Sequence, residues 1–181
     1  MTTPRHLGGH CGITHTDAAV LQLLRGRFEV RTLLDVGCGP GGMAAVARAQ
    51  GVRWIGIDGD PAVCERPPYP LRWDLTIGPY TAARVDLVWC VEVVEHVEAA
   101  YLFNLLTTFR CGRVLFMTHA VPGQEGHHHV NCQPSTYWIE ALERDGWRFD
   151  DDATLAARQA ATDLYTRATG LVFVREDADA V

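Results

Sequence analysis

Three glycines beside an aspartate form the group of residues with the most specific spacing in this sequence. Gly37, Gly39 and Gly42 follow the pattern G-x-G-x-x-G, directly after the apolar segment 32–36 and at the start of a helical pattern. Glycines at this spacing permit a tight turn and a close approach of the backbone to a ligand, which Cβ atoms would block. The pattern therefore predicts a nucleotide-type cofactor loop, although nicotinamide and flavin sites share it.

Asp35 narrows the choice of cofactor, because it stands two residues before the first glycine, where the polar centre of the ligand lies. A carboxylate there would repel a pyrophosphate and attract the cationic amino-acid end and the sulfonium of S-adenosylmethionine. The residue thus favours the methyl donor over a nicotinamide cofactor. The alternative is structural, with Asp35 accepting hydrogen bonds from backbone N–H groups of the turn.

Asp58 ends the next β-type segment, nineteen residues after Gly39. At this separation an acidic side chain meets the ribose hydroxyls of the nucleotide in Rossmann-like folds, so we expect Asp58 to bind the ribose. A turn in the sequence Asp58-Gly59-Asp60-Pro61 would explain the same residue without a ligand.

Four ordered segments around these residues resemble the class I S-adenosylmethionine-dependent methyltransferases, in particular the small single-domain type 11 and type 23 members that act on metabolites. They are Leu-Leu-Asp-Val-Gly-Cys-Gly-Pro-Gly at 33–41, Ile-Gly-Ile-Asp at 55–58, Trp-Asp-Leu at 73–75, and Asp-Leu-Val-Trp-Cys-Val-Glu-Val-Val-Glu-His-Val at 86–97. The resemblance implies a Rossmann-like, doubly wound α/β fold with a seven-stranded, mostly parallel sheet and an antiparallel hairpin at its C-terminal end.

The resemblance also implies which residues bind the cofactor. Asp35 and the glycines would line its methionine part, Asp58 would bind the ribose, and Asp74 with Leu75 would lie beside the adenine. The implied cofactor-binding residues are Asp35, Gly37, Cys38, Gly39, Asp58, Gly59, Asp74, Leu75, Cys90 and Val91. One departure is the segment 59–70, whose four prolines predict a short or distorted helix where a full one is usual. The outer wall of the adenine pocket is the part of the site that this departure leaves undefined.

Histidines follow the C-terminal ends of several expected strands, the edge at which open parallel sheets bind ligands. Methyl transfer from a sulfonium depends largely on proximity and alignment, so a base is needed only if the acceptor must lose a proton. Surface or hydrogen-bonded structural histidines are the alternative at each position. The candidates for such a general base are His96, His119, His128 and His129.

Two carboxylates and an imidazole stand at helical spacing in the segment 92–96. Together with a histidine from the later cluster they would form a partial shell for Mg²⁺, Mn²⁺ or Zn²⁺, made of Glu92, Glu95, His96 and His129. The segment resembles the metal-bearing Glu-x-x-Glu-His of small-RNA 2′-O-methyltransferases and of some ubiquinone-pathway O-methyltransferases, where a metal would lower the pKa of an acceptor hydroxyl. Similar segments occur in methyltransferases that need no metal, in which Glu and His orient the start of a helix and wall the cofactor pocket.

Two further segments carry alternatives for the acceptor side. The histidine-rich stretch 6–15 would either fold over the site as a lid, with His10 or His15 at the acceptor, or form a flexible arm. Tyr137 and Trp138 would either line the acceptor pocket or pack in the core.

Short β-branched segments alternate with helical ones from residue 31 onward, which is typical of βαβ units around a largely parallel sheet. Strands are expected at 32–36, 52–58, 71–73, 85–90, 113–119, 147–150 and 171–175. Helices are expected at 16–26, with Val20, Leu23 and Leu24 inward, and at 42–50, 97–110, 135–145 and 154–167, with Ser135 as an N-cap and Gly146 as a stop. These elements would form one domain, 1–181, in which 1–30 supply the lid and first helix and 176–181 a flexible tail.

Composition limits the classes of function. Apolar residues make up 48% and charged residues 21% of the 181, as in ordinary globular proteins. The net charge of −6 disfavours duplex nucleic acid as a partner, and the apolar runs are too short for a membrane span or a signal peptide. The six cysteines form no C-x-x-C pair, so we expect free thiols in a cytoplasmic protein.

Together these patterns predict an S-adenosylmethionine-dependent methyltransferase that methylates an O or N atom of a small-molecule acceptor. Three alternatives remain. They are metal-assisted methylation of an RNA end or nucleotide, a non-catalytic S-adenosylmethionine-binding domain, and a nicotinamide-dependent oxidoreductase, which Asp35 and Asp74 count against. The sequence indicates neither the identity of the acceptor nor the oligomeric state.

Overall fold

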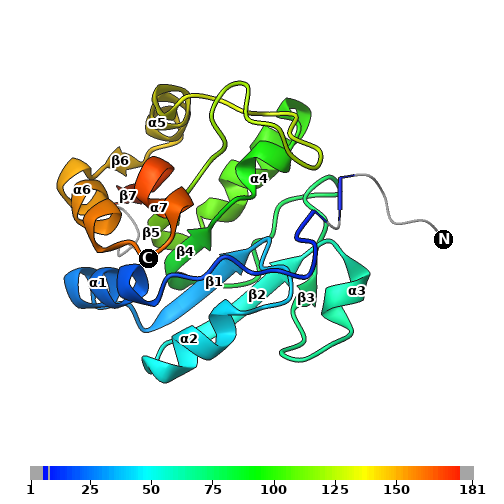
Figure 1. Cartoon of the computed structure of the whole chain (residues 1–181), viewed down its shortest axis with the longest axis horizontal. Helices are drawn as coiled ribbons and strands as arrows, with labels where there is room; N and C mark the ends of the chain where they lie inside the picture. Colours follow the sequence, from blue (N-terminus) through cyan, green and yellow to red (C-terminus); the bar gives the residue numbers. More distant parts are fainter. Residues whose placement is uncertain (1–5, 8, 176–181) are drawn as a thin grey trace.

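A seven-stranded sheet forms the centre of the computed structural model, which describes residues 6–7 and 9–175 (Figure 1). Its strands are β1 (Thr32–Val36), β2 (Arg53–Asp58), β3 (Leu71–Arg72), β4 (Val85–Cys90), β5 (Gly112–Met117), β6 (Arg148–Phe149) and β7 (Leu171–Val174). They lie in the order β3-β2-β1-β4-β5-β7-β6. Neighbouring strands are parallel except at β7, which runs antiparallel to both β5 and β6. The expected mostly parallel α/β sheet with a C-terminal antiparallel hairpin is confirmed.

Helices pack on both faces of this sheet (Figure 1). They are α1 (Ala18–Phe28), α2 (Met43–Ala49), α3 (Pro61–Cys64), α4 (Leu102–Phe109), α5 (Ser135–Arg144), α6 (Asp151–Ala160) and α7 (Leu164–Thr169), with 3₁₀ turns η1 (Val94–His96) and η2 (Ala99–Tyr101). Leu34 belongs to the apolar cluster that includes α4 and α5, whereas its neighbour Leu33 belongs to the cluster with α1, α2 and α6. Alternate residues of a strand point to opposite faces, so the sheet separates two cores.

The order of the strands creates a switch point between β1 and β4. From β1 the chain moves outward to β2 and β3, and then returns to β4 on the other side of β1. Connections that leave in opposite directions open a crevice at the carboxyl ends of the two central strands, which is where open α/β sheets bind ligands. The glycine loop follows β1, and the segment with Glu92 and Glu95 follows β4, so both face this crevice.

Several helix limits differ from those expected. The helix expected at 154–167 is two helices, because α6 ends at Ala160 and α7 begins at Leu164. Asp163 caps α7 by accepting a hydrogen bond from the Thr166 N–H, and the carboxylate of Asp17 accepts the N–H groups of Thr162 and Asp163 in the break. These side chains satisfy backbone groups that a continuous helix would have paired internally.

Three smaller expectations also change. The stretch 97–110 is the 3₁₀ turn η2 followed by the shorter helix α4. Helix α1 begins after its N-cap Asp17 and fully buries Leu21, whereas the expected inward residue Leu23 is only partly buried. Ser135 is the first helical residue rather than the N-cap of α5, whereas Gly146, with a φ of +88°, follows the end of α5 as expected.

The link after Asp58 is short, as its prolines predict, since α3 contains only four residues. Within the described residues, none of the helices is long and apolar enough to cross a membrane. The six cysteines are free thiols, as expected from their spacing.

Candidate active site

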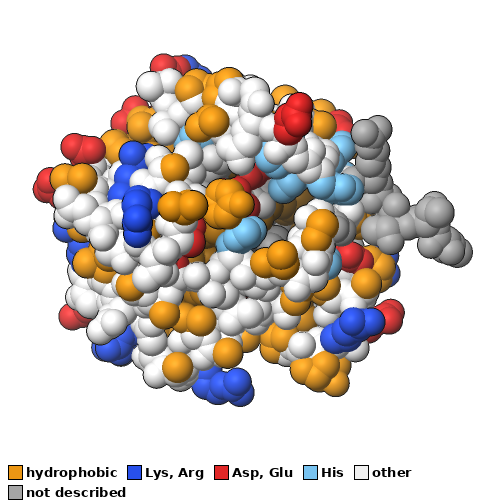
Figure 2. All heavy atoms as spheres, in the orientation of Figure 1, with side chains coloured by type: hydrophobic (Ala, Val, Ile, Leu, Met, Phe, Trp, Pro, Cys, Tyr) orange, Lys and Arg blue, Asp and Glu red, His pale blue; other side chains and the backbone are white. Residues whose placement is uncertain are grey.

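A cavity of about 440 Å³ opens at the carboxyl ends of β1, β2 and β4. Figure 2 shows it as a hollow near the centre of the view, with histidine and acidic side chains around it. Of the ten residues expected to bind the cofactor, nine line the cavity. The exception is Cys90, which is fully buried, so the cavity is reached by its neighbour Val91.

The glycine loop has the conformation that its sequence predicts. Gly37 and Gly39 have φ values of +65° and +51°, a region that residues with a Cβ atom rarely adopt. A Cβ atom on Gly37 would lie 2.6 Å from Cγ2 of Val93, so the loop also packs too closely against the segment after β4 for a larger residue. The N–H groups of Gly37 and Cys38 both donate to the Ile57 carbonyl, which ties the loop to β2.

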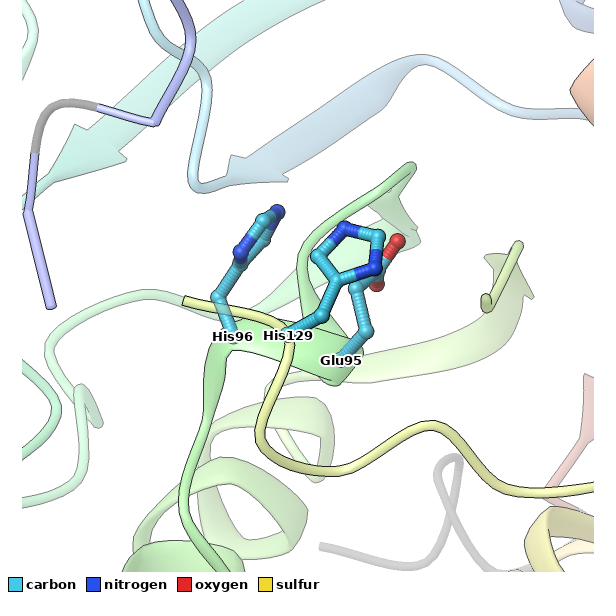
Figure 3. A group of neighbouring side chains, drawn as sticks. All are labelled: Glu95, His96 and His129. Atoms are coloured by element: carbon cyan, nitrogen blue, oxygen red, sulfur yellow. The ribbon is translucent and has the colours of Figure 1, made fainter. Parts of the chain in front are cut away.

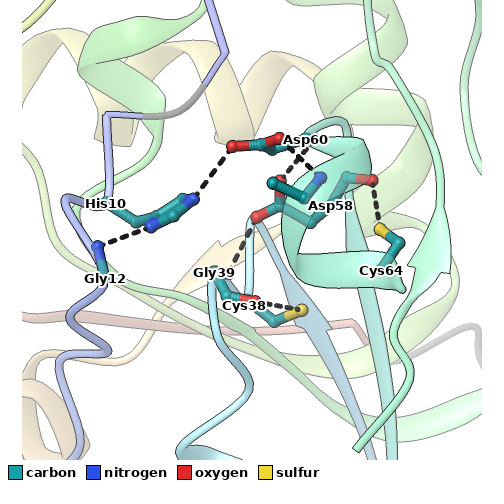
Figure 4. Close-up of polar contacts among 8 residues, drawn as sticks. His10, Gly12, Cys38, Gly39, Asp58, Asp60 and Cys64 are labelled. Carbon is teal, nitrogen blue, oxygen red and sulfur yellow. Dashed lines mark hydrogen bonds and ion pairs between the residues drawn. The ribbon is translucent and has the colours of Figure 1, made fainter. Parts of the chain in front are cut away.

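Asp58 fixes the other side of this loop (Figure 4). Its Oδ2 accepts the Gly39 N–H at 2.8 Å, and its Oδ1 accepts the Asp60 N–H at 2.8 Å. Burial raises the pKa of Asp58. The turn-forming role is therefore present, and the carboxylate lies at the cavity where a ribose contact is expected.

Asp35 is buried beneath the glycine loop, with only 3% of its surface exposed. Its Oδ2 accepts a hydrogen bond of 3.0 Å from Trp54 Nε1, and not from the backbone of the turn. Burial raises its pKa to about 7, and the negative charge of Asp58 adds to this although the Trp54 hydrogen bond opposes it. A cation at the cavity would stabilise the charged form of this carboxylate.

The outer wall of the expected adenine pocket comes from the N-terminal segment. We call the described residues 6, 7 and 9–15 the N-terminal strap. Its His6 Nε2 lies 3.0 Å from Asp74 Oδ2, and its His10 Nε2 lies 3.1 Å from Asp60 Oδ2, as Figure 4 shows for the second pair. Leu7 packs against Gly59, where a Cβ atom would lie 2.4 Å from Leu7 Cδ2. The strap thus covers the side that the short α3 leaves open.

Asp74 is held on both of its oxygens. Oδ1 accepts the N–H and the hydroxyl of Thr76, and Oδ2 faces His6. Burial would raise the pKa of Asp74, but the hydrogen bonds from His6 and Thr76 outweigh burial and lower it. The carboxylate is therefore charged and oriented at the cavity.

Two of the four candidate bases, His96 and His129, line the cavity. His96 Nδ1 donates to the His127 carbonyl at 2.7 Å, and His129 Nδ1 to the Gln124 carbonyl at 2.9 Å. A ring that donates through Nδ1 carries its lone pair on Nε2 when it is neutral. Burial lowers the pKa of His96, which favours this neutral form. Both rings therefore have the tautomer that a base requires.

The other two candidate bases lie elsewhere. His119 is 1% exposed, and its ring nitrogens interact with the Ala120 carbonyl and with the Ser135 hydroxyl, so it does not reach the cavity. His128 Nε2 lies 3.6 Å from Glu98 Oε1 and is buried outside the cavity lining. We therefore keep only His96 and His129 as base candidates.

The expected metal shell is brought together in part (Figure 3). Ligand atoms of Glu95, His96 and His129 lie within 4.8 Å of one another. Glu95 is 0% exposed, and neither of its carboxylate oxygens has a hydrogen-bond partner. Burial and the nearby Glu92 raise its pKa to about 8. The fourth expected ligand, Glu92, is not part of this group.

Glu92 instead is fixed by Thr118, at the end of β5. The Glu92 N–H donates to Thr118 Oγ1 at 2.8 Å, and the same hydroxyl donates to Glu92 Oε1 at 2.8 Å. Glu92 has a φ of +56°, which is uncommon for a residue with a side chain. The clamp holds this conformation and presents the carboxylate at the cavity.

Sequence reasoning missed most of the aromatic wall. Trp89, Tyr101 and Tyr165 line the cavity, and the rings of His15 and Tyr165 meet edge to face at 4.9 Å. Tyr165 comes from α7, far from the motifs in sequence, and no spacing indicated it. Tyr137 and Trp138 were expected either in the acceptor pocket or in the core. The core is the outcome, because Trp138 is fully buried and Tyr137 packs against the same apolar cluster.

Comparisons with known proteins agree with this arrangement. The family model described as a methyltransferase domain matches residues 14–166. Magnesium protoporphyrin IX methyltransferase from Synechocystis PCC 6803, solved with bound SAM, is similar with a TM-score of 0.60 and 18% identity over 88% of this chain and 77% of that one. The methyltransferase domain of bacterial CtHen1-C is similar with a TM-score of 0.60 and 15% identity, over 86% of this chain and 94% of that one. No curated protein sequence matches the chain.

A third similar structure is a cyclase, SpnF, with a TM-score of 0.57 and 16% identity over 87% of this chain and 81% of that one. At these identities the likenesses establish the fold alone, and a fold can carry several reactions. The family rests on the match to residues 14–166, which is more than half of the chain. The chain belongs to the methyltransferase-domain family and has its class I fold.

Proposed function

We propose that this protein is an S-adenosylmethionine-dependent methyltransferase that transfers a methyl group to an O or N atom of a small-molecule acceptor. The observation that carries the proposal is the placement of three carboxylates, Asp35, Asp58 and Asp74, around one cavity beside the glycine loop. S-adenosylmethionine carries an electrophilic methyl group on a cationic sulfonium. The negative charges of the three carboxylates suit such a cationic nucleoside.

The roles of the chain's own residues follow from their positions. Asp35, whose charged form a cation stabilises, would hold the amino-acid end of the cofactor, Asp58 the ribose, and Asp74 the adenine amine. At the acceptor end, His96 or His129 would take a proton through Nε2. The strap would exclude water and align the reactants, which is the main requirement of an in-line transfer.

The size and charge of the cavity favour a small acceptor. The cavity volume of about 440 Å³ must hold the cofactor and the reacting part of the acceptor. The described lining contains no arginine, so a nucleic-acid backbone would lack cationic partners there.

Ligand-dependent thermal unfolding tests this proposal. S-adenosylmethionine and S-adenosylhomocysteine should each raise the Tm, whereas NAD and NADP should not. The variant Asp35→Asn should lose the shift, and Asp151→Asn, an exposed change in α6, should keep it. Stabilisation by NAD alone would overturn the proposal. Cofactor binding without release of S-adenosylhomocysteine over a broad acceptor panel would favour a non-catalytic binding domain.

A second candidate is metal-assisted methylation of an RNA end or nucleotide. The specific observation in its favour is the trio of Glu95, His96 and His129, whose buried carboxylate has no partner. Two imidazoles and a carboxylate fit Zn²⁺ or Mn²⁺, and backbone carbonyls orient both rings from behind. A metal held there would lower the pKa of an acceptor hydroxyl.

Elemental analysis of protein purified without a histidine tag tests this second candidate. The second candidate is supported if the wild-type protein contains one metal ion per chain, if His129→Ala contains none, and if activity requires the metal. Metal-free protein with full activity after chelation would exclude it.

A further inference from the structure

Apart from histidines, the ionisable side chains that line the cavity are mainly carboxylates. Besides the three aspartates assigned to the cofactor, the described lining includes three glutamates and no arginine, and the glutamates are Glu92, Glu98 and Glu125. The printed sequence contains no lysine, so its sixteen basic residues other than histidine are all arginines. An acceptor carboxylate or phosphate would meet only imidazoles and like charges there, whereas an acceptor cation would meet carboxylates.

Glu92 is the best placed of these carboxylates. Glu92 lies two residues after the end of β4 and lines the cavity. The Thr118 hydroxyl accepts a hydrogen bond from the backbone N–H of Glu92 and donates one to its Oε1. The φ of +56° at Glu92 is a left-handed conformation that strains a residue with a side chain, and such strain is concentrated at functional sites. The hydroxyl of Thr118 occupies Oε1, which leaves Oε2 as the oxygen for a ligand.

A second carboxyl group lies behind this end of the cavity, next to a histidine of the lining. The carboxylate of Glu95 is fully buried and unpartnered, and it faces the ring of His129, which lines the cavity (Figure 3). Burial raises the pKa of Glu92, and the hydrogen bond from Thr118 opposes this. A nearby cation would stabilise the charged form of Glu92.

The surroundings of Glu92 fit an organic cation. The rings of His15 and Tyr165 meet edge to face, and both line the cavity. The electrostatic influence of His15 and His129 on Glu92 favours its charged form, and that of Asp163 opposes it. An ammonium group in the cavity would be attracted by the Glu92 carboxylate and by the face of an aromatic ring.

We propose that Glu92 binds an amino group of the acceptor, and that the acceptor is therefore an amine rather than a carboxylate or a phosphate. This inference rests on the proposed methyltransferase function and narrows its substrate class. For such an amine acceptor Glu92, in place of His96 or His129, takes one proton from the ammonium, which leaves a lone pair on nitrogen. That nitrogen then forms the new N–C bond with the donor methyl group, while the electron pair of the broken C–S bond stays on sulfur.

Matched compounds that differ only in their polar group test the proposal. Metal-free protein saturated with S-adenosylhomocysteine is titrated calorimetrically with three triples. They are phenethylamine, 2-phenylethanol and phenylacetate; tryptamine, tryptophol and indoleacetate; and glucosamine, glucose and glucuronate. In at least one triple the amine should bind at least tenfold more tightly than the other two. The proposal is overturned if no triple shows this preference, or if an alcohol or a carboxylate binds best.

Variants locate the preference at Glu92. Glu92→Gln keeps the size of the side chain and should reduce the preference below threefold, whereas Glu140→Gln, on the exposed face of α5, should keep it. Thr118→Val should weaken amine binding by removing the clamp, and Thr118→Ser should restore it. Retention of the preference in Glu92→Gln would overturn the proposal.

Two measurements keep other failures apart. Binding of S-adenosylhomocysteine is measured first for each variant, so an unfolded variant is recognised by loss of that binding. If the wild-type protein does not bind S-adenosylhomocysteine, the proposed function itself fails, independently of any amine preference.

Discussion

His6 and Asp74 pair in the lining of the cavity, with 3.0 Å between Nε2 and Oδ2, although 68 residues separate them in sequence. His10 makes a similar pair with Asp60 at 3.1 Å. Both histidines belong to the N-terminal strap, and both carboxylates lie at or beside the expected nucleoside end of the site. The strap therefore lies over the side of the site that the four-residue helix α3 leaves open.

Replacement of His6 should loosen the strap. We expect His6→Ala to weaken S-adenosylmethionine binding by about three- to tenfold, mainly through faster dissociation, because one hydrogen bond to a charged group is lost. Stopped-flow dissociation would measure the rate, and His6→Gln, which keeps a donor, should stay closer to wild type. Tighter binding in His6→Ala would instead mean that His6 competes with adenine for Asp74.

Asp35 should oppose stability while it serves binding. Burial raises its pKa from 3.8 to about 7, so the folded protein binds this proton more tightly than the unfolded chain does. Its contribution to stability is complete below pH 3.8 and is lost as the pH rises through about 7. We expect Asp35→Asn to be more stable than wild type at pH 8 by on the order of 1–4 kcal/mol, as measured by denaturant unfolding, and to bind S-adenosylmethionine poorly.

The same carboxyl group predicts a pH dependence of cofactor affinity. A cationic ligand prefers the charged form of Asp35, so the affinity of the wild-type protein for S-adenosylmethionine should increase from pH 6 to pH 8. Calorimetric titration at several pH values would show this trend. A flat profile would mean that Asp35 is already charged in the free protein.

Gly37 should tolerate no side chain. Gly37→Ala would combine a φ of +65° with a Cβ atom 2.6 Å from Val93 Cγ2, and should reduce cofactor affinity at least tenfold. Gly51→Ala is the matched control, because Gly51 has a φ of +71° but nothing within 4 Å of its added Cβ. Thermal unfolding should show that both variants lose stability, and calorimetry that only Gly37→Ala loses binding.

Glu95 should destabilise the metal-free protein at high pH. Its pKa is raised from 4.5 to about 8 by burial and by Glu92, so its contribution to stability is lost as the pH rises through about 8. We expect Glu95→Gln to have a higher Tm than wild type at pH 9, and the difference to shrink towards pH 5. If Zn²⁺ binds the trio, it should raise the Tm of wild type and leave that of Glu95→Gln unchanged.

Local chemistry explains why most of the cavity lining beside the glycine loop was predictable from sequence. The Gly37 loop follows β1, Asp58 ends β2 and Asp74 follows β3, and parallel strands bring their carboxyl ends to one edge of the sheet. The seven-stranded, mostly parallel sheet and its C-terminal antiparallel hairpin were expected from the family resemblance. The limits of α6 and α7 were not, because Asp17 stabilises the break between them from more than 140 residues away.

The acceptor side depended on contacts between distant segments. His96, His119, His128 and His129 look equivalent as residue types, and only their places relative to the sheet separate the two at the cavity from the two outside it.

The sequence by itself determined the glycine loop and the carboxylates that line the cavity beside it, because their conformations and charges are local properties of short motifs that end neighbouring strands. Only the tertiary structure decided which histidines reach the cavity, that Thr118 clamps Glu92, and that the N-terminal strap covers Asp74. Each of these is a contact between segments far apart in the chain, and it exists only once the packed cores on both faces of the sheet have fixed their distance.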